Sequence, residues 1–283
     1  MIPLVFASSI QATEANPYGK SKLRAEGHIE ELNRKTKNPC TIIRLPGVFG
    51  KWCKPNYNSV VATFCHNIAR GIPINVVDAK TILTLVYIDD VVATFLDLIS
   101  NARSGLQHET VRPEYQVTVG DLAEQITKFD KGRKNLMIEN VGEGLKRALY
   151  STYVSYLPVE KFSYQLPKHS DVRGEFVEML KTPNCGQFSY FTAKPNVTRG
   201  GHYHHSKTEK FLVISGKALF RSKNINTGEI CEFIVLGGNA EIVDSIPGWA
   251  HDITNIGNEE LIVMLWANET FDKNRPDTVL TKV

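Results

Sequence analysis

Residues 201–209 read Gly-His-Tyr-His-His-Ser-Lys-Thr-Glu and decide how the second half of the chain is interpreted. His202 and His204 stand two positions apart, and side chains at this spacing on a β-strand point to the same face of the sheet. Glu209 follows past a short turn, so its carboxylate can fold back over that face. His251, from a distant strand, adds a fourth group. Imidazole and carboxylate ligands suit Zn²⁺, and also Fe, Ni, Co or Mn, so the pattern predicts a metal centre in a small β-barrel.

The sequence around this motif indicates an all-β domain. From residue 160 onward helical periodicity ends, glycine becomes frequent, and short hydrophobic runs alternate with turn residues. Such runs are typical of the strands of a sandwich or barrel. They lie at residues 187–191, 210–214, 217–220, 232–236, 241–243 and 260–266. The expected β domain covers residues 160–283.

The first half of the chain has a different pattern, in which strands and helices alternate. Strands are expected at residues 2–7, 41–45 and 84–88, and helices at residues 18–34, 60–70, 91–100, 120–128 and 143–153. This alternation is typical of a doubly wound α/β domain. We expect that domain to cover residues 1–155, with the boundary near Pro158.

Composition limits the class of protein. The chain has 283 residues, which suits two domains at roughly 150 residues each. With 33 Lys+Arg against 30 Asp+Glu the net charge is +3, so charge gives no general argument for a nucleic-acid or membrane partner. The five cysteines are scattered and include no Cys-x-x-Cys pair, a pattern that favours reduced thiols. The apolar start is too short for a signal peptide or membrane span, and no other stretch is long enough, so a soluble cytoplasmic protein is expected.

A second candidate site lies near the start of the chain. Residues 18–22 read Tyr-Gly-Lys-Ser-Lys, and at this spacing Tyr18 and Lys22 share one helix face. An ammonium beside a phenol favours phenolate, so Tyr18 can exchange a proton with a carbonyl or alcohol. Ser9, at the end of the preceding strand, can hold the same substrate oxygen. If the motif is considered alone, the more common interpretation is a surface tyrosine beside a solvated lysine.

The order of several short segments strengthens the catalytic interpretation. It resembles the second half of an extended short-chain dehydrogenase/reductase of the nucleotide-sugar-modifying branch. The resemblance implies a partial Rossmann-like fold for residues 1–155. This resemblance implies that Ser9, Tyr18 and Lys22 are catalytic and that Tyr18, Lys22 and Arg44 lie near an NADPH cofactor. It places Asp89 at the end of a strand beside the site. For Arg44 and Asp89, a structural salt bridge is as good an interpretation. The segments are residues 6–9, 17–22, 44–50 and 86–91.

The glycine-rich turn that binds the cofactor pyrophosphate in such enzymes has no counterpart in the sequence. The glycine pairs, Gly200-Gly201 and Gly237-Gly238, both fall in the expected β domain. We therefore expect a truncated product or gene fragment rather than a fold that another chain completes, with an incomplete site for NADPH. Exposed sheet edges then predict poor solubility of this half.

The metal motif itself resembles those of the cupin family of jelly-roll barrels. Residues 201–216 resemble the first cupin motif, and residues 246–255 the second. The departures are a leading glycine that is out of place before His202 and a proline one position late. The resemblance implies Zn held by the histidines and the glutamate named above, and a metal-free cupin with structural histidines is the alternative. Residues 171–176 and 199–203 also resemble cupin-type sugar-nucleotide 3,5-epimerases and 3,4-ketoisomerases, where the histidine at this place can act as a base.

The fusion of an extended reductase to a C-terminal metal cupin resembles one family of bifunctional capsular polysaccharide enzymes. The resemblance implies a homodimer that binds zinc and acts on a UDP-linked 4-keto-6-deoxy amino sugar. The cupin would epimerise C3 of the N-acetylhexosamine, and the reductase would reduce C4 with NADPH, giving a precursor of N-acetyl-L-fucosamine. A 3,4-ketoisomerase and a non-catalytic dimerisation module with a reductase remnant are the alternatives.

Epimerisation at C3 needs a metal and proton carriers. A metal that polarises the 4-ketone acidifies the C3 proton, which one group removes and another returns. The candidate proton carriers are Tyr190, Lys207, Lys210 and His205, and their spacing does not select among them. Trp249 either lines the pocket or packs in the core.

Overall fold

The computed structural model describes residues 2–283 and separates into two compact units. The first unit comprises Met1–Asp130 and Val141–Phe162, and the second Lys131–Asn140 and Ser163–Val283. Each has its own hydrophobic core. The first unit combines helices with mainly parallel sheets and the second is antiparallel β-structure, which confirms the predicted fold class. The predicted boundary at residues 155–160 stays a prediction.

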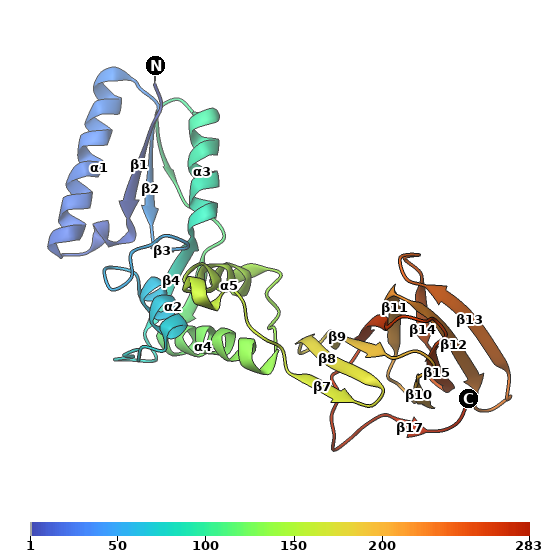
Figure 1. The fold of residues 1–283 in the computed structure, drawn as a ribbon. Helices are drawn as coiled ribbons and strands as arrows, with labels where there is room; N and C mark the ends of the chain where they lie inside the picture. Colours follow the sequence, from blue (N-terminus) through green and yellow to red (C-terminus); the bar gives the residue numbers. More distant parts are fainter. Residues whose placement is uncertain (1) are drawn as a thin grey trace. The chain divides into compact units, whose positions relative to one another are not determined.

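Strands and helices alternate through the first unit (Figure 1). They are β1 (Leu4–Ser9), η1 (Ile10–Thr13), α1 (Pro17–Thr36), β2 (Cys40–Leu45), β3 (Gly47–Phe49), α2 (Val60–Arg70), β4 (Ile82–Tyr87), α3 (Ile88–Ser100), β5 (Leu106–Glu109), β6 (Tyr115–Thr118), α4 (Val119–Asn135), α5 (Gly144–Ser155) and η2 (Val159–Lys161).

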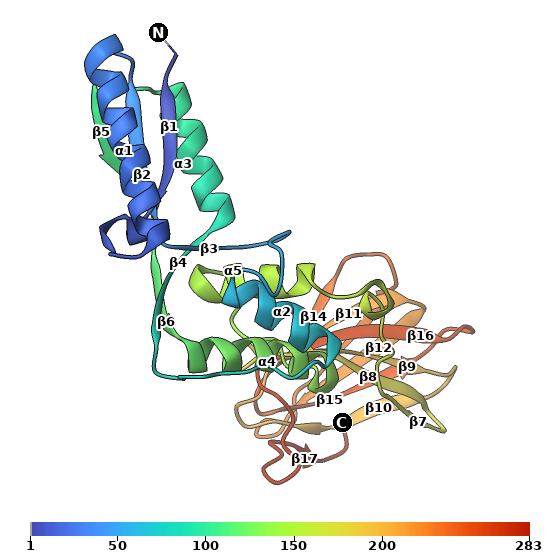
Figure 2. The same ribbon diagram turned by 90° about the vertical axis from the view of Figure 1, so that its left-hand side faces the viewer.

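Two small sheets organise this unit. In the first, of order β1-β2-β5, all neighbours are parallel, and α1 and α3 lie on opposite sides of β1 and β2 (Figure 1). In the second, β3 pairs parallel with β4, and β4 pairs antiparallel with β6. Helices α2, α4 and α5 gather beside this second sheet (Figure 2) and share a core with it. The core includes Phe49, Phe64, Leu122, Ile126 and Tyr153.

The first turn of α1 is shaped by its local sequence. Asn16 caps the helix by accepting the Gly19 backbone N–H at 2.7 Å, and Pro17 occupies the first turn, where its missing N–H costs nothing. A Cβ on Gly19 would lie 2.0 Å from the Gln11 carbonyl oxygen, so only glycine lets α1 approach η1 this closely. The turn that carries Tyr18 therefore lies directly against η1, which follows β1.

Several predicted element bounds differ from the structure by a few residues, and one of these differences changes the position of Asp89. The strand expected to run to residue 88 ends at Tyr87, and α3 begins at Ile88. Asp89 therefore lies in the first turn of a helix rather than at the end of a strand. Acidic side chains stabilise a helix N-terminus through the helix dipole, and Asp89 and Asp90 both occupy that first turn.

The second unit consists of short strands joined by turns. They are β7 (Lys168–Asp171), β8 (Gly174–Lys181), β9 (Gln187–Ala193), β10 (Thr198–Tyr203), β11 (Glu209–Ser215), β12 (Lys217–Asn224), β13 (Ile230–Leu236), β14 (Ile242–Ser245), β15 (Trp249–Asn255), β16 (Leu261–Ala267) and β17 (Val279–Leu280).

These strands form two antiparallel sheets that enclose a core between them. One sheet has the order β13-β12-β15-β10-β17 and the other β14-β11-β16-β9-β8-β7. Alternate side chains point inward, so Phe211 of β11 packs against Phe220 of β12 with ring centroids 5.8 Å apart. The metal motifs stand on strands of both sheets. Among the helices of residues 2–283, none is long and apolar enough to cross a membrane.

Candidate metal centre and a second cavity

The four predicted ligands converge between the two sheets of the second unit. One ligand atom from each of His202, His204, Glu209 and His251 lies within 4.8 Å of the others. Glu209 Oε2 lies 3.3 Å from Nε2 of His204 and 3.4 Å from Nε2 of His251. The His202 ring lies beside both other histidines, with centroids 4.9 Å and 4.7 Å away. The geometry therefore brings together residues that are up to 49 positions apart in the chain, from 202 to 251.

Strand pairing explains how these side chains meet. His202 lies opposite His251 across the β10–β15 pair, and Glu209 is the first residue of β11 in the other sheet. The prediction that both nearby histidines lie on one strand is wrong for His204, because β10 ends at Tyr203. His204 lies beyond the end of the strand, so tertiary contacts rather than strand alternation orient its ring.

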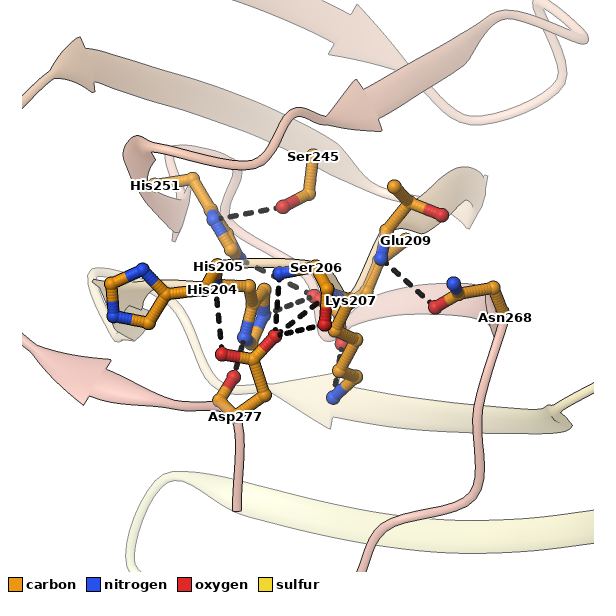
Figure 3. Close-up of polar contacts among 10 residues, drawn as sticks. His204, His205, Ser206, Lys207, Glu209, Ser245, His251, Asn268 and Asp277 are labelled. Atoms are coloured by element: carbon orange, nitrogen blue, oxygen red, sulfur yellow. Dashed lines mark hydrogen bonds and ion pairs between the residues drawn. The ribbon is translucent and has the colours of Figure 1, made fainter. Parts of the chain in front are cut away.

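The far nitrogens of two histidine rings have partners of their own (Figure 3). The backbone carbonyl of Asp277 lies within hydrogen-bonding distance of His204 Nδ1, and Ser245 Oγ lies 3.1 Å from His251 Nδ1. If each Nδ1 carries its proton and donates to these oxygens, each Nε2 keeps a free lone pair that points toward Glu209. Metal-binding histidines are held in this way, so the partners suit ligation.

Glu209 is a buried carboxylate with a different contact on each oxygen. Its Oε2 faces the histidines, whereas Oε1 lies 2.9 Å from Lys207 Nζ. Burial raises the pKa of Glu209, but the close polar contacts with the imidazoles of His204 and His251 and the charge of Lys207 outweigh it, and the pKa lies well below its usual range. The carboxylate therefore stays ionised, as a metal ligand must.

The surroundings of His202 favour its neutral state. Burial, with a smaller contribution from the neighbouring histidines, lowers the pKa of His202 to about 4. Neutral imidazoles and one ionised carboxylate with converging lone pairs form a donor set for a divalent metal, so the residues fit such an ion.

The structure separates the four candidate proton carriers. Lys207 lies against the cluster through Glu209, and its side chain is 12% exposed. Lys210 pairs with Asp244 at 2.6 Å on the exposed face of β11. Tyr190 lies on the face of β9 opposite to Phe191, which packs in the core. His205 is exposed and stacks edge-on against Tyr203.

A cavity of about 270 Å³ lies inside the second unit. Trp249 lines it together with Phe233 and Val243, so the pocket interpretation of Trp249 is the one that the structure favours. Ser222, also on its wall, lies opposite His251 across the β12–β15 pair, which places the cavity beside the metal cluster.

The three predicted catalytic residues of the first unit share a second cavity, of about 790 Å³. Ser9 ends β1, and its hydroxyl accepts the Gln11 backbone N–H at 3.2 Å. Tyr18 is 51% exposed on the first turn of α1. Lys22 Nζ lies 5.8 Å from the centre of the Tyr18 ring and donates to the Ala7 carbonyl at 2.9 Å. The lysine thus joins the tyrosine to the end of β1.

Arg44 and Asp89 both form ion pairs. The Arg44 guanidinium makes two hydrogen bonds to Glu26 of α1, at 3.0 Å and 2.7 Å, and Glu26 is 2% exposed. Asp89 pairs with Lys51 at 2.6 Å. The structure therefore favours the salt-bridge interpretation of Arg44, and a contact of Arg44 with a cofactor stays a prediction.

Sequence reasoning missed the residues that support these sites. Glu26 lies between Arg44 and the hydroxyl of Ser8. Ser245 stands two residues before the proline-glycine turn of the second metal motif, and Asp277 lies in a polar segment beyond the last predicted strand. Only the position of Ser245 next to a motif offered a signal, because the other two depend on segments that are distant in sequence.

Comparisons with known proteins agree with this division. Residues 6–112 match the model of the NAD dependent epimerase/dehydratase family, and residues 169–279 match the polysaccharide biosynthesis C-terminal domain. A UDP-2-acetamido-2,6-beta-L-arabino-hexul-4-ose reductase of Pseudomonas aeruginosa is 57% identical over 282 residues, which cover 100% of this chain and 76% of the relative.

Solved structures match the fold over nearly the whole chain. The capsular polysaccharide assembling protein CapF from Staphylococcus aureus is 44% identical, with a TM-score of 0.94 over 99% of this chain and 76% of that chain. A structure of CapF with the inhibitor 3-isopropenyl-tropolone is 41% identical, with a TM-score of 0.89 over 99% of this chain and 79% of that chain.

Fold, cavities and family models together define an enzyme that joins an epimerase/dehydratase-type α/β unit to a polysaccharide-biosynthesis β unit. The sequence identity to the P. aeruginosa reductase and to CapF, over nearly all of this chain, identifies the family within that class. The chain belongs to the CapF family.

Proposed function

We propose that this chain modifies a nucleotide sugar in capsular polysaccharide synthesis, and that its β unit epimerises C3 of a UDP-linked 4-keto-6-deoxy-N-acetylhexosamine. The observation that carries the proposal is the buried cluster of three histidines and Glu209, in one chain with the cavity of Ser9, Tyr18 and Lys22. The name of the P. aeruginosa relative, a UDP-2-acetamido hexul-4-ose reductase, supports this substrate class.

In this proposal His202, His204, Glu209 and His251 hold a divalent metal, with zinc the expected ion. The bound metal would supply Lewis-acid polarisation of the 4-ketone, which makes the proton at C3 acidic. The apolar walls of the cavity beside His251 suit the hexose ring and its methyl group, because ligand pockets combine apolar lining with few polar groups.

Lys207 is the proposed proton carrier of this site. Of the four candidates it is the one whose charged group contacts a ligand residue, at 2.9 Å from Glu209 Oε1. Its ammonium can protonate C3 of the enolate after another group has removed the original C3 proton, and the resulting amine is reprotonated from solvent. Its contact with Oε1 leaves Oε2 for the metal. Its low exposure favours a fixed position over a solvated one.

For the α/β unit we propose reduction of the C4 ketone by Ser9, Tyr18 and Lys22. Tyr18 would give its proton to the developing alkoxide, Ser9 would hold the same oxygen, and Lys22 would orient the phenol. NADPH would supply the hydride. We also propose that the chain forms a homodimer, which analytical ultracentrifugation tests: a monomeric mass would remove this part.

Deuterium exchange tests the epimerase proposal directly. The zinc-loaded protein is incubated with the UDP-4-keto sugar in D₂O, and the product is analysed by NMR and mass spectrometry. We expect deuterium at C3 faster than in samples without protein or with chelator-treated protein. No enzyme-dependent incorporation with metal bound would remove the proposal, and would favour the non-catalytic dimerisation module.

The same product spectrum separates the rival enzyme activity. A 3,4-ketoisomerase would move the carbonyl from C4 to C3, whereas an epimerase leaves it at C4. For the reductase half, NADPH titration decides: saturable binding supports C4 reduction, and no binding by this chain removes it.

A further inference from the structure

We infer that Asp277 is the positioning residue of the metal centre: its backbone carbonyl orients His204, and its carboxylate holds the loop that carries Lys207. The inference rests on the proposed metal binding by the four-residue cluster. It concerns the segment after β16, which contributes none of the four ligands.

In the loop between β10 and β11, residues 204–208, backbone N–H groups donate hydrogen bonds to this distant segment. The backbone N–H of His205 donates to Asp277 Oδ1 at 2.9 Å, and those of Ser206 and Lys207 donate to Oδ2 at 2.7 Å and 2.8 Å. The Ser206 hydroxyl also donates to Oδ2, at 3.0 Å. The next N–H, of Thr208, donates to Asn268 Oδ1 at 3.0 Å. Every amide from 205 to 208 is therefore fixed by a side chain of the segment after β16 (Figure 3).

This arrangement matters because the loop has no strand partner of its own. Backbone N–H groups that lack a partner destabilise a folded conformation, so a loop without these acceptors would adopt others. His204 directly precedes the four residues whose N–H groups are held in this way, and Lys207 is one of the four. Displacing the loop would move a ligand and the ammonium that contacts Glu209.

The Asp277 backbone is itself held close to the ligands. Two residues later β17 pairs with β10, where Leu280 lies opposite His202, and the Thr281 N–H donates to the Gly201 carbonyl at 3.0 Å. The same short segment therefore fixes the loop through the Asp277 carboxylate, the His204 ring through the Asp277 carbonyl, and the strand of His202 through pairing. The three N–H donors also keep the pKa of Asp277 well below its usual range, so the carboxylate accepts all these bonds at neutral pH.

Zinc affinity tests this inference without any activity assay. The wild-type protein and Asp277→Ala are titrated with zinc in competition with a chromogenic chelator, and cobalt-loaded samples give the visible absorption spectrum of the bound ion. We expect Asp277→Ala to weaken zinc binding by about 10- to 100-fold, the usual effect of losing a group that orders metal ligands, and to change the cobalt spectrum. A merely structural role would not alter the spectrum of a folded sample.

Asp272→Ala is the matched control, because Asp272 lies in the same segment and accepts the Asn274 N–H at 2.9 Å without touching the loop. Its affinity and spectrum should match the wild type. If Asp277→Ala does not fold by circular dichroism, Asp277→Asn decides, since one amide oxygen cannot serve donors that use two carboxylate oxygens, and several-fold weaker binding is expected. Wild-type affinity and spectrum in the folded variant would overturn the inference, whereas a wild-type protein that binds no zinc would overturn the metal assignment itself.

Discussion

The two candidate sites of this chain are built in opposite ways. In the metal cluster, His204 is 1% exposed, His251 5% and Glu209 7%, and each has a further partner. In the cavity of the first unit, Tyr18 is 51% exposed, and Lys22 is anchored by a hydrogen bond to a backbone carbonyl. Buried polar groups without partners are costly, so a buried site must be organised by the fold before any ligand arrives. In an open site, a bound substrate can itself supply some of the contacts that position the side chains.

The largest effect is expected from Glu209→Gln. The substitution removes the ionised ligand from a buried cluster, so zinc affinity should fall by more than about 100-fold, beyond the loss typical of supporting residues. Chelator competition measures the affinity, and C3 deuterium exchange should fall to the level without protein. Glu175→Gln is the control, because Glu175 pairs with Lys168 and does not line the cavity beside His251. Unchanged zinc content in Glu209→Gln would contradict the ligand assignment.

Tyr18→Phe sharpens the contrast between the two sites. Loss of the phenolic proton should lower NADPH-dependent C4 reduction by about 1,000-fold, within the range of general acid catalysis. C3 deuterium exchange should stay at the wild-type rate, because the metal cluster belongs to the other unit. Tyr57→Phe, at a tyrosine that is 75% exposed outside the cavity lining, should change neither rate. Equal losses in both assays for Tyr18→Phe would refute the division of labour.

Lys207→Met tests proton transfer separately from metal binding. The side chain stays unbranched, one atom shorter, but loses its ammonium, so C3 exchange per bound zinc should fall by about 100-fold. Lys210→Met makes the same chemical change on the face of β11 opposite to Glu209, where no effect on C3 exchange is expected. Should both variants exchange at the wild-type rate, Lys207 would not be the proton carrier.

The smallest effect is expected in the framework of the first unit, from Glu26→Gln. Glu26 is buried and its Arg44 partner is part-exposed, so we expect a loss of about 1–2 kcal/mol in the free energy of unfolding. Urea unfolding of this unit measures it. Glu31→Gln, in an exposed pair with Lys35, should cost only about 0.3 kcal/mol. A loss no larger in Glu26→Gln than in Glu31→Gln would contradict the structural role.

The pH dependence of Glu26 has a definite sign. The hydrogen bonds from Arg44 hold the folded-state pKa of Glu26 below its ordinary value of 4.5. The unfolded chain therefore binds more protons in this range, so the stabilisation is present above about pH 4.5 and is lost as the pH falls through the folded pKa. The difference between wild type and Glu26→Gln should shrink in acid, and a constant difference would count against the ion pair.

Much of the fold followed from local patterns. The helix expected at residues 60–70 is α2 without any shift, because its amphipathic spacing and its flanking Ser59 and Gly71 act within the element. Short strands such as β5 and β6 were missed, since four-residue strands carry too little periodicity to stand out. The strand predicted at residues 84–88 is β4, Ile82–Tyr87, and its predicted end is one residue too late because the apolar Ile88 begins the next helix.

The four candidate ligands were predicted from spacing and residue type, whereas their surroundings were not. His204 and Asp277 are 73 residues apart, and Glu26 and Arg44 are 18 apart on a helix and a strand. No sequence pattern links such pairs, because their meeting depends on how strands are ordered and in which register they pair.

The sequence by itself determined the division into an α/β and a β half, the residue types of the metal cluster, and the shared helix face of Tyr18 and Lys22. These depend on periodicity and short spacing, which act within one strand or helix. Only the tertiary structure decided that Lys207, rather than Tyr190, Lys210 or His205, meets the cluster, that Arg44 pairs with Glu26, and that Asp277 clamps the loop after β10. The physical reason is that a side chain's partners are set by packing between segments, and a single chain position carries no record of which distant segment will lie beside it.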